Sequence, residues 1–349
     1  MKTLLLVLAS LLVIASFIPL LRNEEWWIRI FDFPRIQIVF FSVLTITAFF
    51  IFFDTDTITS QVIMSLLLAS ILYQGWEMLP YTPLWKIQSV HEEKEDKGNT
   101  VRLLISNVRQ KNRDTQKLLD LVREKKPDIL LAVETDDYWY SRLKILENEY
   151  AYSKCKPLNN TYGVLLFSNL ELINAEFRFL VDEEVPSIKT EVALPSGNRF
   201  VLYCIHPKPP AMGKDTEDRD AELVVIGKES RKLNSPVMVA GDLNDVAWSH
   251  TTRMFQRISG LLDPRRGRGF FNTFNANIPF FRWPLDHVFH SDHFQLKKLE
   301  VCRHIGSDHF PVLIELVFIP DEKHEQEKPK ADEDDREEGE EKLVKAGVA

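Results

Sequence analysis

The segment VMVAGDLN (residues 237–244) joins a short apolar run to an acid and an amide. The run Val237–Ala240 has the length and composition of a buried β-strand. Asp242 and Asn244 follow where this strand ends. Rigid strands that hold polar side chains at their tips are a common basis for an active site. The segment therefore predicts a core strand that delivers two polar side chains to a functional edge.

Other segments repeat this pairing of an apolar strand with an acid, an amide or a histidine at its tip. They are LLISNV (103–108) with Asn107, PDILLAVE (127–134) with Glu134, VLYCIH (201–206) with His206, LDHVF (285–289) with Asp286, and GSDHFP (306–311) with Asp308 and His309. Taken singly, each polar residue has a commoner role as a cap, a turn residue or a core histidine. Taken together, carboxylates and amides suit Mg²⁺ or Mn²⁺, and histidines move protons near neutral pH.

The periodicity from residue 100 onward predicts a mixed α/β domain. The expected strands are 101–108, 128–133, 162–167, 200–205, 237–240, 285–289 and 312–318, and the expected helices are 114–125, 138–147, 215–233 and 249–259. Periodicity alone leaves open a doubly wound sheet or a two-sheet sandwich with outer helices. The sequence contains neither a Gly-rich phosphate loop nor a Gly-x-Ser-x-Gly motif, which disfavours nucleotide-driven transfer and serine hydrolysis.

The first 85 residues predict a membrane anchor. Three stretches without charge, 3–21, 36–53 and 58–76, are each long enough to cross the hydrocarbon core. The first could instead be a signal peptide, but no small-x-small cleavage site follows it, and two further spans do. Bases in the first loop and after the third span favour a cytoplasmic catalytic domain by a few charges, which leaves the membrane side open.

The charge distribution marks the other boundaries. Residues 86–99 include HEEKEDKGN and are expected to form a charged linker. The net charge of the chain is -8, and residues 321–349, with 12 acids and 6 bases, account for -6 of it. Because residues 320–349 are poor in apolar side chains, they are expected to be a disordered acidic tail. The part between linker and tail is nearly neutral.

In their order, LLISNV, PDILLAVE, the histidine strand, GDLN, LDHVF and GSDHFP resemble the endonuclease/exonuclease/phosphatase superfamily. This superfamily includes deoxyribonucleases, sphingomyelinases and inositol-phosphate phosphatases. The resemblance covers residues 100–319 and suggests a membrane-anchored member of bacterial type. It implies a four-layer α/β-sandwich, with two β-sheets flanked by helices, and metal-dependent hydrolysis of a phosphoester.

The resemblance also implies a role for each polar residue. Glu134 would be the principal ligand of Mg²⁺ or Mn²⁺, with Asn107 beside it and Asp308 in support. Asp242 and Asn244 would orient the attacking water and the phosphate, and His309, with Asp286 on its far nitrogen, would act at the scissile phosphate. His206 matches a second acid–base group of some members, although its neighbours in HPKPP depart from the family pattern. Arg268, Asn272 and Trp283 lie in the loop that borders the substrate cleft in the family.

The sequence thus predicts a membrane-anchored phosphodiesterase that resembles the endonucleases and uses a metal-assisted water. A phospholipid or sphingomyelin phosphodiesterase and an inositol-phosphate phosphatase are alternatives, and an inactive membrane scaffold is a remote one. The expected partners are the lipid bilayer and a phosphodiester, either nucleic acid or a phospholipid head group. No protein partner is predicted.

Overall fold

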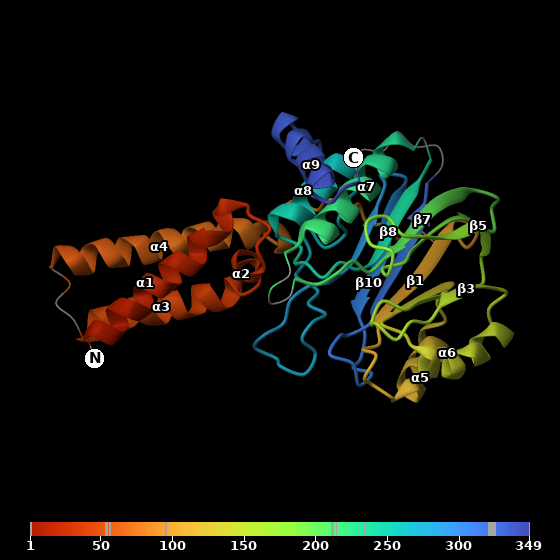
Figure 1. Ribbon diagram of the computed structural model, residues 1–349, viewed down its shortest axis with the longest axis horizontal. Coiled ribbons are helices and arrows are strands. Elements are labelled where there is room, and N and C mark those ends of the chain that lie inside the picture. Colours follow the sequence, from red (N-terminus) through yellow and green to blue (C-terminus); the bar gives the residue numbers. More distant parts are fainter. Residues whose placement is uncertain are drawn as a thin grey trace.

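The computed structural model describes residues 2–348 except 53, 54, 56, 95, 211, 212, 214, 234 and 320–325. A bundle of helices extends to one side of a body that contains two sheets (Figure 1). The strands are β1 Thr100–Asn107, β2 Ile129–Val133, β3 Tyr152–Lys156, β4 Val164–Ser168, β5 Glu171–Arg178, β6 Ser187–Ala193, β7 Arg199–Ile205, β8 Val237–Asp242, β9 Asp286–His290, β10 Phe294–Val301 and β11 Val312–Phe318. The α-helices are α1 Lys2–Phe17, α2 Trp26–Arg29, α3 Arg35–Phe52, α4 Ile58–Met78, α5 Thr115–Lys125, α6 Asp137–Leu143, α7 Glu217–Lys232, α8 His250–Ser259 and α9 Glu333–Lys345.

The strands form two mixed sheets. One has six strands in the order β10-β11-β1-β2-β4-β3, and the other has five in the order β5-β6-β7-β8-β9. The pairs β1/β2 and β7/β8 are parallel, and the other pairs are antiparallel. Helices α5 and α6 cover the six-stranded sheet, and α7 and α8 cover the five-stranded one. The predicted four-layer sandwich is confirmed.

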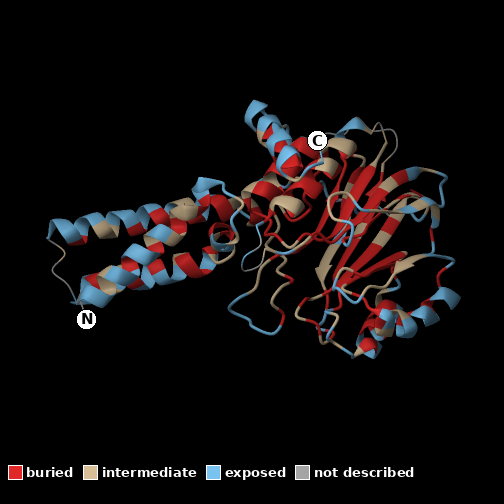
Figure 2. Cartoon of the chain, viewed as in Figure 1, coloured by how far each residue is buried: buried red, intermediate tan, exposed pale blue. Residues whose placement is uncertain are grey.

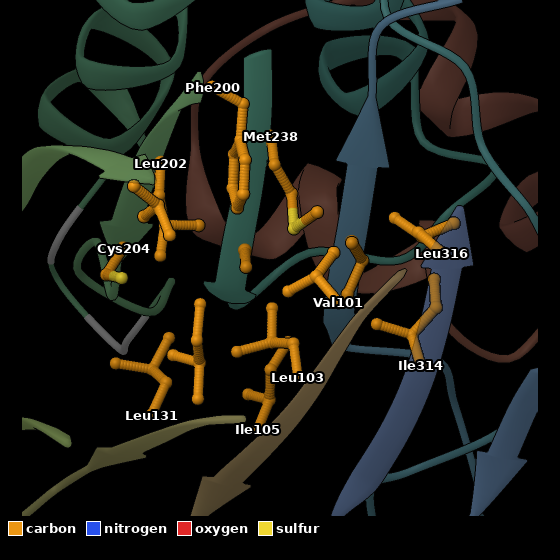
Figure 3. Close-up of a cluster of buried hydrophobic side chains, with 14 of the residues drawn as sticks. Val101, Leu103, Ile105, Leu131, Phe200, Leu202, Cys204, Met238, Ile314 and Leu316 are labelled. Carbon is orange, nitrogen blue, oxygen red and sulfur yellow. The ribbon is translucent and has the colours of Figure 1, made fainter. Parts of the chain in front are cut away.

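The core between the sheets follows from alternation along each strand. Val101, Leu103 and Ile105 of β1 face the other sheet, whose Phe200 and Met238 complete the cluster (Figure 3). Leu104 of β1 points instead into the layer under α5 and α6. Both faces of the strand are therefore buried, which explains the nearly continuous apolar run from which it was predicted.

The predicted strands all form, but the sequence pattern missed four others: β3, β5, β6 and β10. Strands β3 and β10 are the edges of the six-stranded sheet, and β5 is an edge of the five-stranded one. Edge strands and their neighbours keep polar and charged side chains, as in YSKCK and FQLKKLEV. Without a continuous apolar run, they are hard to distinguish from loops.

Three helices are long and apolar enough to cross a membrane, over Thr3–Leu21, Arg35–Phe52 and Ile58–Tyr81. Their outer faces expose large apolar side chains, while a narrow seam between them is buried (Figure 2). The predicted second span ended at Phe53, which lies outside the described residues. We call residues 2–85 the membrane head.

The membrane head is docked onto the sandwich. The Trp248 indole N–H donates to the Asp32 carbonyl at 2.7 Å, and the Tyr81 hydroxyl donates to the Ala247 carbonyl at 2.5 Å. Glu77, at the end of α4, pairs with Arg253 of α8 at 2.6 Å. The loop between α1 and α3 therefore lies at the end of the helices that contacts the sandwich.

Two of the bases counted for membrane orientation are not free surface charges. Arg29 and Arg35 are buried, and both pair with the buried Asp32, at 3.3 and 2.9 Å. Their charge is compensated within the protein, so it adds little to the surface bias that the positive-inside rule counts. The charge count therefore supports a cytoplasmic domain less than the sequence suggested.

The charged segment 86–99 is not a free tether. Ser89 is fully buried and its hydroxyl lies 2.9 Å from His290 Nε2. Farther along, His91 forms an isolated β-bridge with Leu296 of β10. The segment therefore runs along the sandwich and fixes the membrane head to it at a second place.

The prediction of a disordered tail is wrong for the described residues from 326 onward. Helix α9 begins with a capping box between Asp332 and Asp335 and packs on α7 and α8. Asp335 forms a bidentate pair with Arg257 at 2.6 and 2.7 Å, and the buried Lys342 pairs with Asp220 at 3.0 Å. Composition suggested disorder because the acids were counted without the bases of α7 and α8 that face them. Residues 320–325 lie outside the described residues.

Glu222 on α7 predicts a pH dependence of stability. Burial, followed by the nearby Asp182 and Asp218, raises the pKa of this carboxyl to about 8. The folded protein then holds a proton that the unfolded chain releases above its usual pKa of 4.5. The contribution is intact below pH about 4.5 and is lost as pH rises through about 8, by up to about 1.4 kcal/mol per unit. We expect Glu222→Gln to flatten the unfolding free energy against pH in this window, whereas Glu171→Gln, at an exposed position on β5, leaves it unchanged.

Candidate active site

The polar strand tips of both sheets meet in one place. The Asn107 amide, at the end of β1, donates to Glu134 Oε1 at 2.8 Å and to Asp242 Oδ2 at 2.9 Å. Glu134 follows β2 in the same sheet, while Asp242 ends β8 in the other. Asn107 therefore joins the two sheets, and it holds two carboxylates side by side.

His309 and Asp286 form a buried pair beside these carboxylates. His309 Nδ1 lies 2.8 Å from Asp286 Oδ2, and its Nε2 lies 3.6 Å from Asp242 Oδ2. Burial alone would lower the pKa of His309, but Asp286 and Asp242 outweigh it and raise this pKa to about 10. The imidazole therefore carries a proton at neutral pH, and Asp286 fixes the orientation of the ring.

The backbone around these residues is shaped for the site. Glu134 and Asn244 both have positive φ, at 59° and 52°. The Asn244 N–H donates to Asp242 Oδ1 at 2.9 Å, and its side chain donates to the Pro207 carbonyl at 2.9 Å. Such conformations persist where surrounding contacts determine them. The GDLN turn is held by its own acid and amide.

Gly241 explains why this turn begins with glycine. A Cβ at Gly241, which has φ +149°, would meet the Ile205 carbonyl of β7 far inside contact distance. We expect Gly241→Ala to separate β8 from β7, lower the unfolding free energy by about 2 kcal/mol, and displace Asp242. Gly75→Ala is the control because a Cβ there meets nothing within 4 Å. Equal thermal unfolding midpoints for the two variants would contradict this account.

The remaining predicted residues lie around this centre with different contacts. His206 Nε2 is 3.9 Å from Asp242 Oδ2, and its ring packs near Tyr162 with centroids 5.7 Å apart. Asp308 pairs with Arg109 at 3.3 Å. Both therefore border the carboxylate cluster, and neither forms a hydrogen bond to Glu134 among the described residues.

A pocket of about 590 Å³ opens onto this centre. Its polar end is lined by Glu134, Asn244, Asp308 and His309. The rest of its wall is apolar or aromatic and is made by Trp26, Ile30, Phe33, Pro34, Pro209, Pro210, Phe274, Phe281, Trp283 and Leu285. Four of these residues belong to the membrane head, so the pocket lies between the head and the sandwich.

Of the three residues predicted to bind substrate, only Trp283 lines the pocket. Arg268 donates instead to the Pro264 and Ser89 carbonyls and secures the segment after the membrane head. Asn272 is half-buried next to Thr273, whose hydroxyl accepts from the Asp286 N–H. Substrate binding by Arg268 stays a prediction, and a basic motif does not reveal that backbone carbonyls engage its donors.

No pattern in the sequence indicates that Trp26, Ile30 or Phe33 lies at the site. These residues lie in the loop between the first two spans, more than 200 positions before His309. Pro209 and Pro210 were also not predicted to line the site, although the segment HPKPP that contains them departs from the family pattern after His206. An unusual local sequence next to a predicted site residue was the available signal.

The sequence model of the endonuclease/exonuclease/phosphatase family matches residues 101–309. The chain belongs to this family. A family protein from Beutenbergia cavernae has a similar structure, with TM-score 0.51 and 16% identity over 63% of this chain and 72% of that chain. A second, from Bacteroides thetaiotaomicron, has TM-score 0.50 and 17% identity over 64% of this chain and 97% of that chain. These likenesses support the fold, and the comparison with curated protein sequences gives no match.

In this family member, one ligand atom from each of Asp242, Asp286 and His309 lies within 4.8 Å of the others. A protonated His309 has no free nitrogen lone pair, so the two carboxylates are the members of this cluster that can ligate a metal ion. Asp286 Oδ1 is buried and has no hydrogen-bond donor among the described residues. The Glu134 carboxylate adds further oxygen atoms nearby, and the Asn107 Nδ2 amide links it to Asp242. Such an oxygen-rich donor set fits a hard divalent cation.

Proposed function

We propose that the chain is a membrane-anchored, divalent-metal-dependent phosphodiesterase that hydrolyses its substrate by attack of water, with chemistry like that of the family's endonucleases. The observation that carries the proposal is the buried array in which Asp242 lies between Asn107 and the His309–Asp286 pair. The three apolar helices support anchoring in a bilayer.

Each residue of the site has its own role in the proposed reaction. Glu134 and Asn107 would hold Mg²⁺ or Mn²⁺, with Asp308 nearby. The bound ion would neutralise phosphate charge and stabilise the leaving oxygen. Asp242 and Asn244 orient the water and the phosphate, and His309 presents a proton on Nε2 to a phosphate oxygen. Asp286 accepts from Nδ1–H, which orients the ring and stabilises the doubly protonated imidazolium. His206 lies next to Asp242 and can assist proton transfer to or from the Asp242 carboxylate.

The test is metal removal from the full-length protein in detergent micelles. We expect hydrolysis of bis(p-nitrophenyl) phosphate with Mg²⁺ or Mn²⁺, its loss after EDTA treatment, and its recovery when the ion is returned. Glu134→Gln should weaken metal binding, measured by calorimetry, as well as turnover. Turnover that persists without metal would contradict the proposal. Metal binding without any hydrolysis would favour an inactive scaffold.

A further inference from the structure

We propose that the membrane head is a substrate-selecting wall of the active site, and that the substrate is a membrane phospholipid, whose phosphodiester lies next to its hydrocarbon chains. This inference rests on the proposed phosphodiesterase function. The hydrocarbon part of the lipid contacts the apolar wall of the pocket. The loop between α1 and α3 is the element that selects the lipid.

The pocket has the polarity of an amphipathic substrate. His309, Asp308 and Glu134 gather at one end, and Trp26 and Ile30 belong to the apolar remainder. A phosphate at the polar end would leave the rest of a bound molecule in contact with apolar side chains. A hydrocarbon chain is stabilised there, because each methylene group that it buries is removed from water.

Aromatic contacts connect the apolar wall to the membrane head. Phe281 lines the pocket, and the adjacent Phe280 packs against Phe40 and Phe41 of α3, with ring centroids 5.7 and 6.2 Å apart. The side chain of Gln37, in the first turn of α3, also donates to the Phe280 carbonyl. The tip of the loop before β9 therefore lies against a candidate membrane span.

This loop tip and the facing head loop expose apolar side chains together. Ile278, Phe280 and Phe281 are 48, 44 and 42% exposed, and Ile30 is 51% exposed. Clustered apolar exposure beside a candidate span is expected where a protein meets the lipid interface. A lipid chain can therefore contact the apolar wall of the pocket from the side that faces the candidate span.

The charges around the pocket disfavour a nucleic acid. The described lining residues include two acids and neither lysine nor arginine. Basic side chains around the site are already paired: Arg109 with Asp308 at 3.3 Å, Lys208 with Asp218 at 2.7 Å, and Arg265 with Asp263 at 2.7 Å. Lys214 lies outside the described residues. Nucleic-acid grooves instead present free basic side chains along the backbone path.

The experiment is competition against hydrolysis of bis(p-nitrophenyl) phosphate by the full-length protein in detergent micelles with Mg²⁺. The competitors are dioleoyl-phosphatidylglycerol in mixed micelles, its deacylated product glycerophosphoglycerol, and a single-stranded oligonucleotide. We expect the lipid to compete at least about ten-fold better than either soluble competitor, an effect that needs burial of roughly two methylene groups.

Two matched substitutions separate recognition from partitioning into the micelle. Ile30→Asp should lower the ratio of lipid to glycerophosphoglycerol competition about ten-fold, and Ile30→Leu should restore it. Ile145→Asp changes a similarly exposed isoleucine (48%) in the short helix that directly follows α6, and α6 lies far from the head (Figure 1). It should leave both the ratio and turnover unchanged. If Ile30→Asp does not fold, Phe281→Ser makes the same test.

The outcomes distinguish this inference from the function beneath it. If Ile30→Asp and Phe281→Ser keep metal-dependent hydrolysis and an unchanged ratio of lipid to glycerophosphoglycerol competition, the membrane head does not select a lipid. The phosphodiesterase proposal then still stands. Stronger competition by the oligonucleotide overturns it in favour of a nucleic acid. Absence of metal-dependent hydrolysis overturns the phosphodiesterase proposal itself.

Discussion

Replacing His309 with glutamine is expected to lower kcat/KM for bis(p-nitrophenyl) phosphate on the order of 10³-fold. Glutamine keeps a polar side chain of similar reach but cannot carry the proton that Asp286 and Asp242 hold on the imidazole. The loss should fall on kcat more than on KM, because the proton is needed mainly as charge develops in the transition state. Steady-state kinetics of the full-length variant measure both constants.

The control is His91→Gln, since His91 is exposed and only its backbone takes part in a β-bridge. It should retain turnover within about two-fold, as surface substitutions usually do. Asp286→Asn should share most of the His309→Gln loss, because it removes the acceptor that fixes Nδ1–H. Turnover in His309→Gln close to that of His91→Gln would remove His309 from the mechanism.

The polar residues at the strand ends were predictable because each one is adjacent in sequence to the apolar run that predicts its strand. Asn107, Asp242 and Asp286 each occupy the first or last position of a strand whose interior is apolar, so the strand and its polar end are both visible in the sequence. The fold then brings the ends of β1, β8 and β9 to one place. The hydrogen bonds through Asn107 that join the sheets could not be foreseen, because they depend on how two sheets far apart in sequence pack.

The membrane head was predictable in length and composition but not in position. Apolar runs reveal a span, because the bilayer demands one. They do not reveal that Tyr81, a few residues beyond the predicted third span, is 1% exposed and packs against Val246 and Trp248. Likewise, residues at the start of the chain could be assigned to the active-site wall only after docking was known. Long-range contacts of this kind leave no local periodicity.

Removing Asp32 is expected to weaken the docking of the membrane head by about 3 kcal/mol, as for other buried ion pairs that lose one partner. Asp32 is 2% exposed and accepts from Arg35 at 2.9 Å, while Arg29 lies 3.3 Å from it. In Asp32→Ala both guanidinium groups stay buried. Arg29 keeps Thr251 as its hydrogen-bond acceptor, and Arg35 keeps Gln74 and, at 3.8 Å, Glu77. The uncompensated charge around Arg29 is the main source of the loss.

The measurement is unfolding in detergent micelles followed by tryptophan fluorescence, because the buried Trp248 indole donates to the Asp32 carbonyl. Asp120→Ala is the matched control: Asp120 faces Arg123 at 4.0 Å with both side chains about half exposed, and its loss should cost under about 1 kcal/mol. Phe33 and Pro34 directly follow Asp32 and line the pocket, so Asp32→Ala should also reduce competition by the lipid more than competition by glycerophosphoglycerol. A destabilised Asp32→Ala protein with an unchanged lipid preference would show that the head is held by Asp32 but does not select the substrate.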